Sequence, residues 1–207
     1  DHRYFLNLFY LGRFPGSFAT GLPFNFNPRT QDMRISGTTA SLAGLEKAIR
    51  IHDDAYRATA LRRIIMIHSL ILSVGGIPLL YLGDEVGTLN DYGFRDEPGK
   101  AHDSRWVHRP AADPARYEQR HDETTDAGQI FGTLRRLIDL RKQIPALADG
   151  ETHFIYTGNP AVLGYTRHNT LLVLANFSEF PQQVDPNTIQ NEWFPIREAV
   201  DLVTDAP

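Results

Sequence analysis

The feature that most constrains the fold is the stretch SVGGIPLLYLGDEVG, which runs from Ser73 to Gly87. Its centre, Ile77–Leu82, is a short apolar run with glycines on both sides. A run of this length that is apolar on both faces is typical of a strand buried in a parallel sheet. The sequence therefore predicts a buried strand over Ile77–Leu82. Asp84 and Glu85 would follow its carboxyl end, where β/α barrels carry their chemistry.

Helices predicted on both sides of this strand favour a β/α arrangement. Arg57–Leu72 has a broad apolar face and follows Asp53 and Asp54, either of which would cap a helix. Ala127–Gln143 also carries apolar side chains at helical spacing. The long polar loop between the strand and this second helix, residues 88–124, is expected to be functional or disordered, with Trp106 anchoring part of it.

The two ends of the chain have different patterns. Asp1–Leu11 is predicted to be a short helix, and Thr38–Leu45 to begin another that is capped near Ser36 or Thr38. Pro and Gly residues make the stretch between them loop-rich. After Gly150 the pattern changes to short β-type runs separated by turn residues, HFIYTG, VLGYTRHN and TLLVLANFSE. These runs predict a hairpin series and hence a C-terminal antiparallel module.

Composition excludes several classes of protein. The 207 residues are 42% hydrophobic and 22% charged, which are globular values, and a net charge of -4 gives no reason to expect nucleic acid or an anionic membrane as partner. Cysteine is absent, which excludes disulfides and thiolate metal sites. No apolar run approaches the ~20 residues of a membrane span, and the first residues do not resemble a signal peptide. We expect a soluble protein, located in the cytoplasm.

Three groups of polar residues are candidates for chemistry. Arg105, within Asp103-Ser104-Arg105-Trp106, could hold vicinal hydroxyls or pair with a carboxylate, or could be an ordinary surface arginine. His52-Asp53-Asp54 could supply a glycosidase carboxylate, but a helix follows at once, so capping explains it better. Asp84 and Glu85 are adjacent and would point in opposite directions from a strand end, so they cannot easily face one substrate. No spacing indicates a metal or phosphate site, and no cofactor is expected.

Several longer motifs carry a resemblance to a known family. They are DHRYFLN, GSFATGLPFNFNPRTQDMRISGTTASLAGL, GGIPLLYLGDEVGTLNDYGF, DSRWVHRP, AGQIFGTLRRLIDLRKQIPAL and LLVLANFSEFPQ. With these the chain resembles the C-terminal part of amylosucrases and sucrose hydrolases, which are members of the α-amylase family of glycoside hydrolases. GGIPLLYLGDE alone would indicate only that wider family.

The resemblance implies an α/β fold that is the C-terminal portion of a (β/α)8 barrel. Residues 1–40 would form an insertion between barrel strand 7 and helix 7. Residues 41–148 would form helix 7, strand 8 with its long loop, and helix 8. Residues 149–207 would form an incomplete antiparallel β-sandwich domain. The family's catalytic carboxylates would then lie upstream of Asp1, so the isolated chain is predicted to be inactive.

The resemblance also implies an activity and a set of substrate-binding residues. Such enzymes cleave sucrose with retention and pass the glucosyl group to an α-1,4-glucan or to water. Arg105 matches the arginine that closes the glucosyl pocket, and Arg34 matches the one that contacts the fructosyl or first acceptor ring. Arg3 and Phe5 match positions of the outer acceptor subsites. The implied partners are sucrose, an α-glucan acceptor and the remaining N-terminal part of the enzyme.

Two other interpretations stay open. The chain could be a carbohydrate-binding or scaffolding module without chemistry of its own. It could also belong to another sucrose- or trehalose-acting relative of α-amylase, although DHRYFLN and SRWVHRP favour the first interpretation. The sequence does not decide between transferase and hydrolase.

Overall fold

The computed structural model describes residues 2–168, 170–189 and 200–203. They divide into two compact units, one of residues 1–64 with 80–132 and the other of residues 65–79 with 133–207. Two long helices, α4 (Asp54–Ser73) and α6 (Asp126–Gln143), contribute to both units. The structure is α/β, with two small antiparallel sheets. The three-segment division at residues 40 and 148 stays a prediction.

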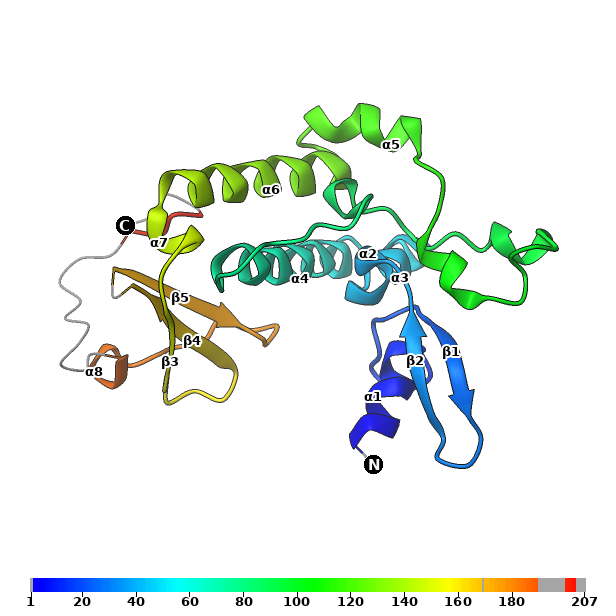
Figure 1. Ribbon diagram of the computed structural model, residues 1–207, viewed down its shortest axis with the longest axis horizontal. Coiled ribbons are helices and arrows are strands. Elements are labelled where there is room, and N and C mark those ends of the chain that lie inside the picture. The colour runs from blue at the N-terminus through cyan, green and yellow to red at the C-terminus, as the bar shows by residue number, and fades with distance from the viewer. Residues whose placement is uncertain (1, 169, 190–199, 204–207) are drawn as a thin grey trace. The chain divides into compact units, whose positions relative to one another are not determined.

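The first unit begins with a helix and a hairpin that lie against each other (Figure 1). Helix α1 (His2–Tyr10) confirms the predicted N-terminal helix. Strands β1 (Leu22–Asn27) and β2 (Asp32–Ser36) form a two-stranded antiparallel sheet in a stretch that the sequence predicted to be mostly loop. The prolines in and after β1 hid this hairpin, because they are typical of turns rather than of paired strands.

Short helices complete the first unit. Helix α2 (Thr39–Ala43) begins where expected, since the Thr38 hydroxyl accepts a hydrogen bond from the Ser41 amide. The other short segments of this unit are α3 (Leu45–Ile51), η1 (Asp84–Val86), η2 (Gly93–Asp96), η3 (Ser104–His108), α5 (Pro114–Glu118) and η4 (Gln119–His121). The long loop is therefore structured, and its apolar side chains join the core, whose fully buried members include Leu45, Val86, Val107 and Ile130.

The second unit contains the predicted C-terminal hairpin series. Strands β3 (Thr152–Ile155), β4 (Val162–Arg167) and β5 (Leu171–Asn176) form a sheet in the order β3-β4-β5, with every pair antiparallel. Short helices α7 (Pro145–Ala148) and α8 (Pro186–Ile189) precede and follow it. Residues 190–199 and 204–207, which belong to the predicted β-sandwich, lie outside the described residues.

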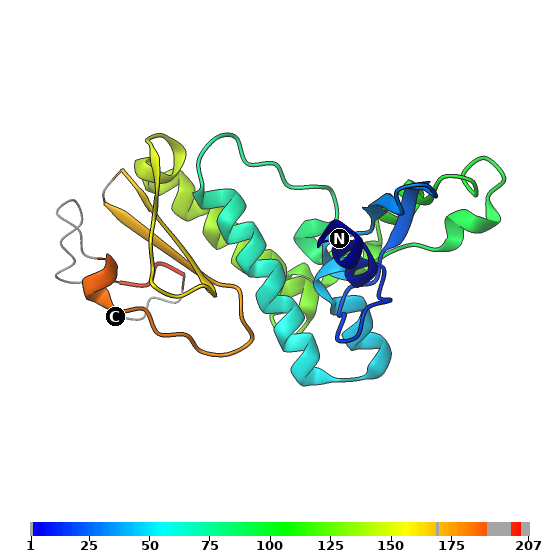
Figure 2. The same ribbon diagram turned by 90° about the horizontal axis from the view of Figure 1, so that it is seen from below.

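The prediction of a buried strand over Ile77–Leu82 is wrong for this structure. Figure 2 draws the segment after α4 as coil, without a strand arrow. Ile77, Leu79 and Leu82 are 97%, 81% and 77% exposed. A parallel strand exists only when neighbouring strands accept its main-chain hydrogen bonds. No described residue pairs with this segment as a strand, so its apolar sequence alone does not make one.

The described residues include no helix that combines the length and the apolar character needed to cross a membrane.

Candidate functional site

Arg105 is held in a defined orientation at the start of η3. The Asp103 carboxylate accepts hydrogen bonds from the Arg105 main-chain amide at 3.0 Å, from Nε at 2.9 Å and from Nη2 at 2.8 Å. These bonds, the guanidinium first, lower the pKa of Asp103 to about 2. One face of the guanidinium lies over the Phe24 ring, 4.5 Å from its centroid. Arg105 is thus held by the Asp103 carboxylate and lies against the Phe24 ring, while 46% of its side chain remains exposed.

The structure brings Arg34 to the same hairpin. In the β1–β2 register Phe24 lies directly opposite Arg34, and directly opposite residues of an antiparallel pair project from the same face. Segment η3 is tied to β1 because the Ser104 hydroxyl donates to the carbonyl of Pro23 at 2.7 Å. Arg105 and Arg34, which are far apart in the sequence, are therefore both neighbours of Phe24 at one hairpin.

Arg3 and Phe5 both belong to α1, which contacts strand β2 of the hairpin. Arg3 Nε is 2.8 Å from Asp32 Oδ1, so an ion pair connects α1 to the first residue of β2. Phe5 is 51% exposed and its ring meets Phe14 edge to face, with centroids 5.9 Å apart. All four predicted binding residues thus lie on the β1–β2 hairpin or on α1 and η3, which contact it. Their role in binding stays a prediction.

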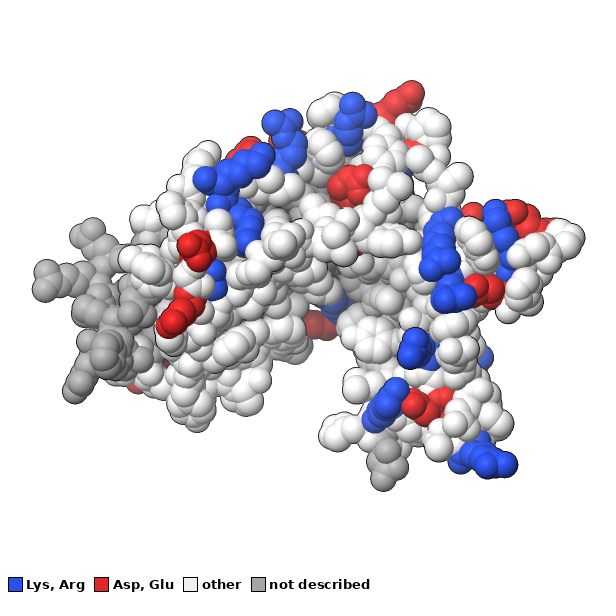
Figure 3. Space-filling view, viewed as in Figure 1, with Lys and Arg blue, Asp and Glu red and all other residues white. Residues whose placement is uncertain are grey.

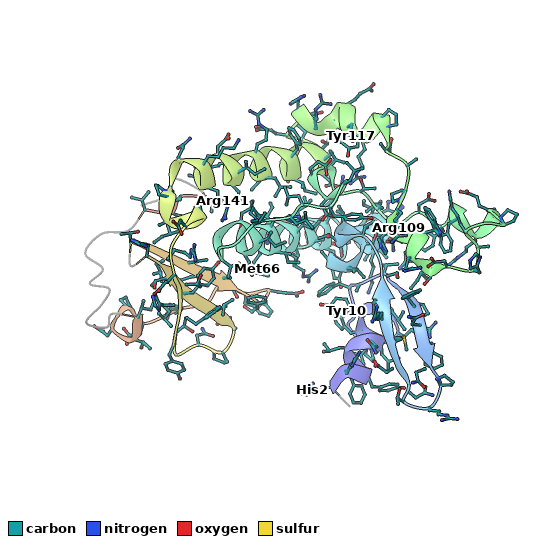
Figure 4. The ribbon with its side chains drawn as sticks, in the orientation of Figure 1. His2, Tyr10, Met66, Arg109, Tyr117 and Arg141 are labelled. Atoms are coloured by element: carbon teal, nitrogen blue, oxygen red, sulfur yellow. The ribbon has the colours of Figure 1, made fainter. Side chains whose placement is uncertain are left out.

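Trp106, which the sequence suggested as an anchor of the long loop, is contacted by charged side chains of the same loop, while its neighbours Ser104 and Val107 attach the loop to the unit. Lys100 Nζ and the Arg109 guanidinium lie 4.9 and 5.6 Å from the centroid of its ring, and Lys100 also pairs with Glu97. Figure 4 labels Arg109 beside this loop, and Figure 3 shows basic and acidic side chains intermixed over it. The region around Arg105 therefore combines an aromatic face with closely spaced charges of both signs.

Of the adjacent carboxylates Asp84 and Glu85, Glu85 has hydrogen-bond partners that give it a structural role. Glu85 accepts a hydrogen bond from the Gly83 amide at 2.7 Å and one from the Tyr117 hydroxyl at 2.6 Å. Burial, followed by the bond to Glu85, raises the pKa of Tyr117 to about 12. Glu85 therefore closes the turn that follows residues 77–82. Tyr117, labelled in Figure 4, gave no signal in the sequence because its partner is a distant residue.

The capping interpretation of His52-Asp53-Asp54 is confirmed. Asp53 Oδ1 accepts a hydrogen bond from the Tyr56 amide at 2.9 Å, which caps α4, and His52 ends α3 with a left-handed φ of 54°. Across the described ranges, His, Asp and Glu side chains form no group of three or more that could hold a metal ion.

Asn90 is a residue that sequence reasoning missed. Its side chain accepts from the Thr38 amide at 2.8 Å and donates to the Thr20 carbonyl at 2.6 Å, and its own amide donates to Ser41 Oγ at 2.9 Å. Asn90 thereby joins the long loop to α2 and to the segment that leads into β1. An asparagine in a loop has no spacing that would predict such contacts.

Comparison with known proteins gives a consistent but coarse result. No model of a known protein family matches the chain. The chain is 27% identical to trehalose synthase/amylase TreS of Mycobacterium tuberculosis, over 56% of this chain and 24% of that protein. It is 29% identical to trehalose synthase of Pimelobacter sp., over 56% of this chain and 25% of that protein.

A third relative is oligo-1,6-glucosidase of Halalkalibacterium halodurans, 25% identical over 60% of this chain and 30% of that protein. The similarity is to α-amylase-family glycoside hydrolases. Their family fold is a (β/α)8 barrel with a C-terminal domain. The chain spans roughly a quarter of the length of these relatives. Similarity to amylosucrase in particular is not among these findings, so that part of the resemblance stays a prediction.

Proposed function

We propose that this chain is the C-terminal part of a retaining enzyme that cleaves sucrose and transfers the glucosyl group to an α-1,4-glucan or to water. It would supply the last β/α units of a (β/α)8 barrel and part of a β-sandwich. Residues 77–82 would become a strand once neighbouring barrel strands pair with them. Location in the cytoplasm is part of the same proposal.

The observation that supports the proposal most is the arrangement of Arg105, Phe24 and Arg34. A guanidinium that is bonded to Asp103 and lies over the Phe24 ring is held in place, and its Nη1 has no part in the bonds to Asp103. Such a fork suits the paired hydroxyl oxygens of a sugar ring, and little side-chain entropy is lost on binding because the fork is already ordered. In the proposed enzyme Arg105 closes the glucosyl pocket, and Arg34 contacts the fructosyl or first acceptor ring.

Arg3 and Phe5 would contribute to the outer acceptor subsites. Phe5 offers an exposed ring on which a sugar face can lie, and Arg3 is held by Asp32 beside the strand that carries Arg34. Retaining cleavage needs two carboxyl groups ~5–5.5 Å apart across the glycosidic bond. We propose that both come from the remaining N-terminal part of the enzyme, and that the isolated chain releases no fructose from sucrose.

A second candidate comes from the names of the relatives. Two are called trehalose synthase and one is called oligo-1,6-glucosidase, so a glucoside other than sucrose is the alternative substrate. A third candidate, a carbohydrate-binding or scaffolding module without chemistry, would need no carboxylates from elsewhere.

A chimera separates these candidates. The chain replaces the matching C-terminal part of a sucrose-cleaving enzyme of this family, and the product is given sucrose, trehalose or isomaltose. Fructose release from sucrose, lost in Arg105→Ala and reduced in Arg34→Ala, supports the proposal. Arg29→Ala is the matched control, since Arg29 is an exposed arginine at the turn of the same hairpin.

Other outcomes decide against sucrose. Glucose release from trehalose or isomaltose alone would identify the second candidate. A chimera that folds and binds maltooligosaccharides but cleaves none of the three disaccharides would favour the binding module. Fructose release by the isolated 207-residue chain would contradict the assignment of the carboxylates to another part of the enzyme.

A further inference from the structure

The end of α4 is held by two arginines that belong to other elements of its unit. Arg141, on α6, donates from Nη1 to the carbonyl of Leu72 at 2.5 Å and from Nη2 to that of Gly76 at 2.6 Å. Arg167, on β4, donates from Nη1 to the carbonyl of Val74 at 3.2 Å. Three alternate carbonyls, at residues 72, 74 and 76, are thus bonded to two guanidinium groups. We call these two side chains and three carbonyls the guanidinium clamp.

The same side chains also reach the element before the β-sheet. Arg141 Nη1 donates to the carbonyl of Leu147 at 2.6 Å, and Arg167 Nε donates to that of Ala146 at 3.0 Å. Thr152 of β3 joins the clamp, because its hydroxyl donates to the Val74 carbonyl at 2.6 Å and accepts from Arg167 Nη1. The clamp therefore links the end of α4, helix α7 and the β3–β4 pair within one unit. Figure 4 labels Arg141 on α6.

Gly75 fits against the Arg167 guanidinium. Its φ is +103°, which side chains other than hydrogen rarely allow, and a Cβ built there would lie 2.7 Å from Arg167 Nη1. The planar group therefore packs directly on the glycine backbone. Sequence reasoning noted this glycine only as the boundary of an apolar run.

The partners of these guanidinium groups are unusual for buried charges. Arg167 is 2% exposed, and its partners in the described part of the chain are carbonyl oxygens and the Thr152 hydroxyl. The last carbonyls of a helix have no partner within the helix, and they form the negative end of its dipole. The clamp bonds the last-turn carbonyl of Leu72 and the carbonyls of Val74 and Gly76 just beyond the helix, so its positive charge lies at the negative end of the α4 dipole.

We propose that Arg141 and Arg167 are positioning residues, which fix the direction in which the chain leaves α4 and enters residues 77–82. The segment they direct leads through Gly83 to Glu85 and the loop that carries Arg105. Arg167 of β4 would thus direct the chain within its own unit, in addition to packing against Gly75. This proposal holds for any substrate of the enzyme, since it concerns main-chain geometry alone.

Arginine is required by this geometry. A single guanidinium reaches two carbonyls at once because its N–H groups diverge in a fixed plane, whereas a lysine ammonium is one point of charge on a flexible stem. Arg141→Lys and Arg167→Lys therefore keep the charge and lose the bridging between carbonyls. The lysine variants therefore test the effect of the bridging on the direction of the chain without a change in charge.

The absence of cysteine allows a clean test on the whole chain. Spin labels are placed in pairs on Ile77→Cys with Tyr156→Cys, and on Lys142→Cys with Tyr156→Cys, all at exposed positions of the second unit. Pulsed electron–electron double resonance measures the distribution of distances between the two spin labels of each pair. The first pair reports the direction of the segment, and the second reports the packing of the unit.

The expected result is specific to the first pair. In the clamp variants Arg141→Lys and Arg167→Lys the 77–156 distribution should broaden, while the 142–156 distribution keeps its width. Arg135→Lys, an exposed arginine of the same helix, should change neither. Circular dichroism checks that each variant is folded.

Two results would overturn the proposal. One is an unchanged 77–156 distribution in the folded lysine variants. The other is equal broadening in both pairs, which would show that the arginines only stabilise the unit. If Arg167→Lys does not fold, Arg141→Lys alone decides, because Arg141 is only partly buried.

Discussion

Two six-residue runs of the chain, Ile77–Leu82 and Val162–Arg167, differ in whether they form a strand. Strand β4 pairs with β3 on one side and β5 on the other, and Tyr165 at its centre is completely buried. Residues 77–82 pair with nothing in the described part of the chain, and Ile77 is 97% exposed. Both partners of β4 are its neighbours in sequence, and short turns connect them.

The difference shows what a strand prediction contains. A hairpin carries its own partner a few residues away, so the sequence of one short region is enough to form it. A parallel strand needs partners across a long crossover, and its apolar sequence states only that it can be buried. Ile77–Leu82 can therefore form the strand that the family resemblance implies only when further strands pair with it.

The largest expected effect is on the free energy of unfolding, compared between a truncation in β4 and one in residues 77–82. Tyr165→Ala removes a buried ring and a hydroxyl that lies 2.5 Å from Ser73 Oγ, so it should lower the free energy of unfolding by about 3–5 kcal/mol. Leu79→Ala, at an 81% exposed position, should change it by less than about 0.5 kcal/mol. Urea unfolding followed by circular dichroism measures both.

Tyr165→Phe is the matched control for the ring. It keeps the packing and loses only the hydrogen bond to Ser73, so a cost of about 1 kcal/mol is expected. A large cost for Leu79→Ala would mean that residues 77–82 are buried in solution, and the comparison would fail.

Hydrogen exchange should separate the two runs next. Amides of β4 that are bonded to β3 or β5 open only with the sheet, so their exchange should be slowed at least about a thousandfold. Amides of residues 77–82 donate no main-chain hydrogen bond to any described residue and should exchange near the unprotected rate. Protection of residues 77–82 in the monomeric chain would contradict the exposed conformation.

The exposed run should also make the chain associate with itself. Contiguous exposed apolar side chains with unpaired main-chain groups favour contact between copies. Replacing Leu79 and Leu82 with lysine removes two leucines that are each more than three-quarters exposed. Since burying one leucine is worth about 1.5–3 kcal/mol, the concentration at which copies associate should rise roughly tenfold or more. Sedimentation velocity measures the concentration at which copies associate. Replacing the exposed Phe154 of β3 and Tyr156 of the following turn with lysine shows whether the sheet edge contributes instead.

What the sequence predicted correctly was local. The capping residues Thr38 and Asp53 act within three residues of the helix they begin, and the hairpin series pairs neighbours. What it missed depends on distance along the chain. Asn90 bonds to Thr20, and Arg105 stacks on Phe24, and neither contact leaves a periodic pattern. The resemblance pointed to Arg105 and Arg34, but only the coordinates show that both are neighbours of one phenyl ring, that of Phe24.

The smallest expected effect concerns the turn that follows residues 77–82. This turn is held by hydrogen bonds of the Glu85 side chain. The Tyr117 hydroxyl donates to Glu85, and burial and this bond raise the pKa of Tyr117 to about 12 from a usual 10. Because the folded pKa is the higher one, the bond stabilises the turn fully below pH 10, and this contribution is lost as the pH rises from 10 through about 12.

Ultraviolet absorbance of phenolate, as the difference between the parent chain and Tyr117→Phe, isolates this titration. Glu85→Gln removes the negative charge and keeps an acceptor oxygen, so the pKa of Tyr117 should fall, yet stay above 10, since burial is the larger cause. A difference titration centred at 10 in the parent chain would mean that the turn is open in solution, and that residues 77–82 are unrestrained at their far end as well as unpaired.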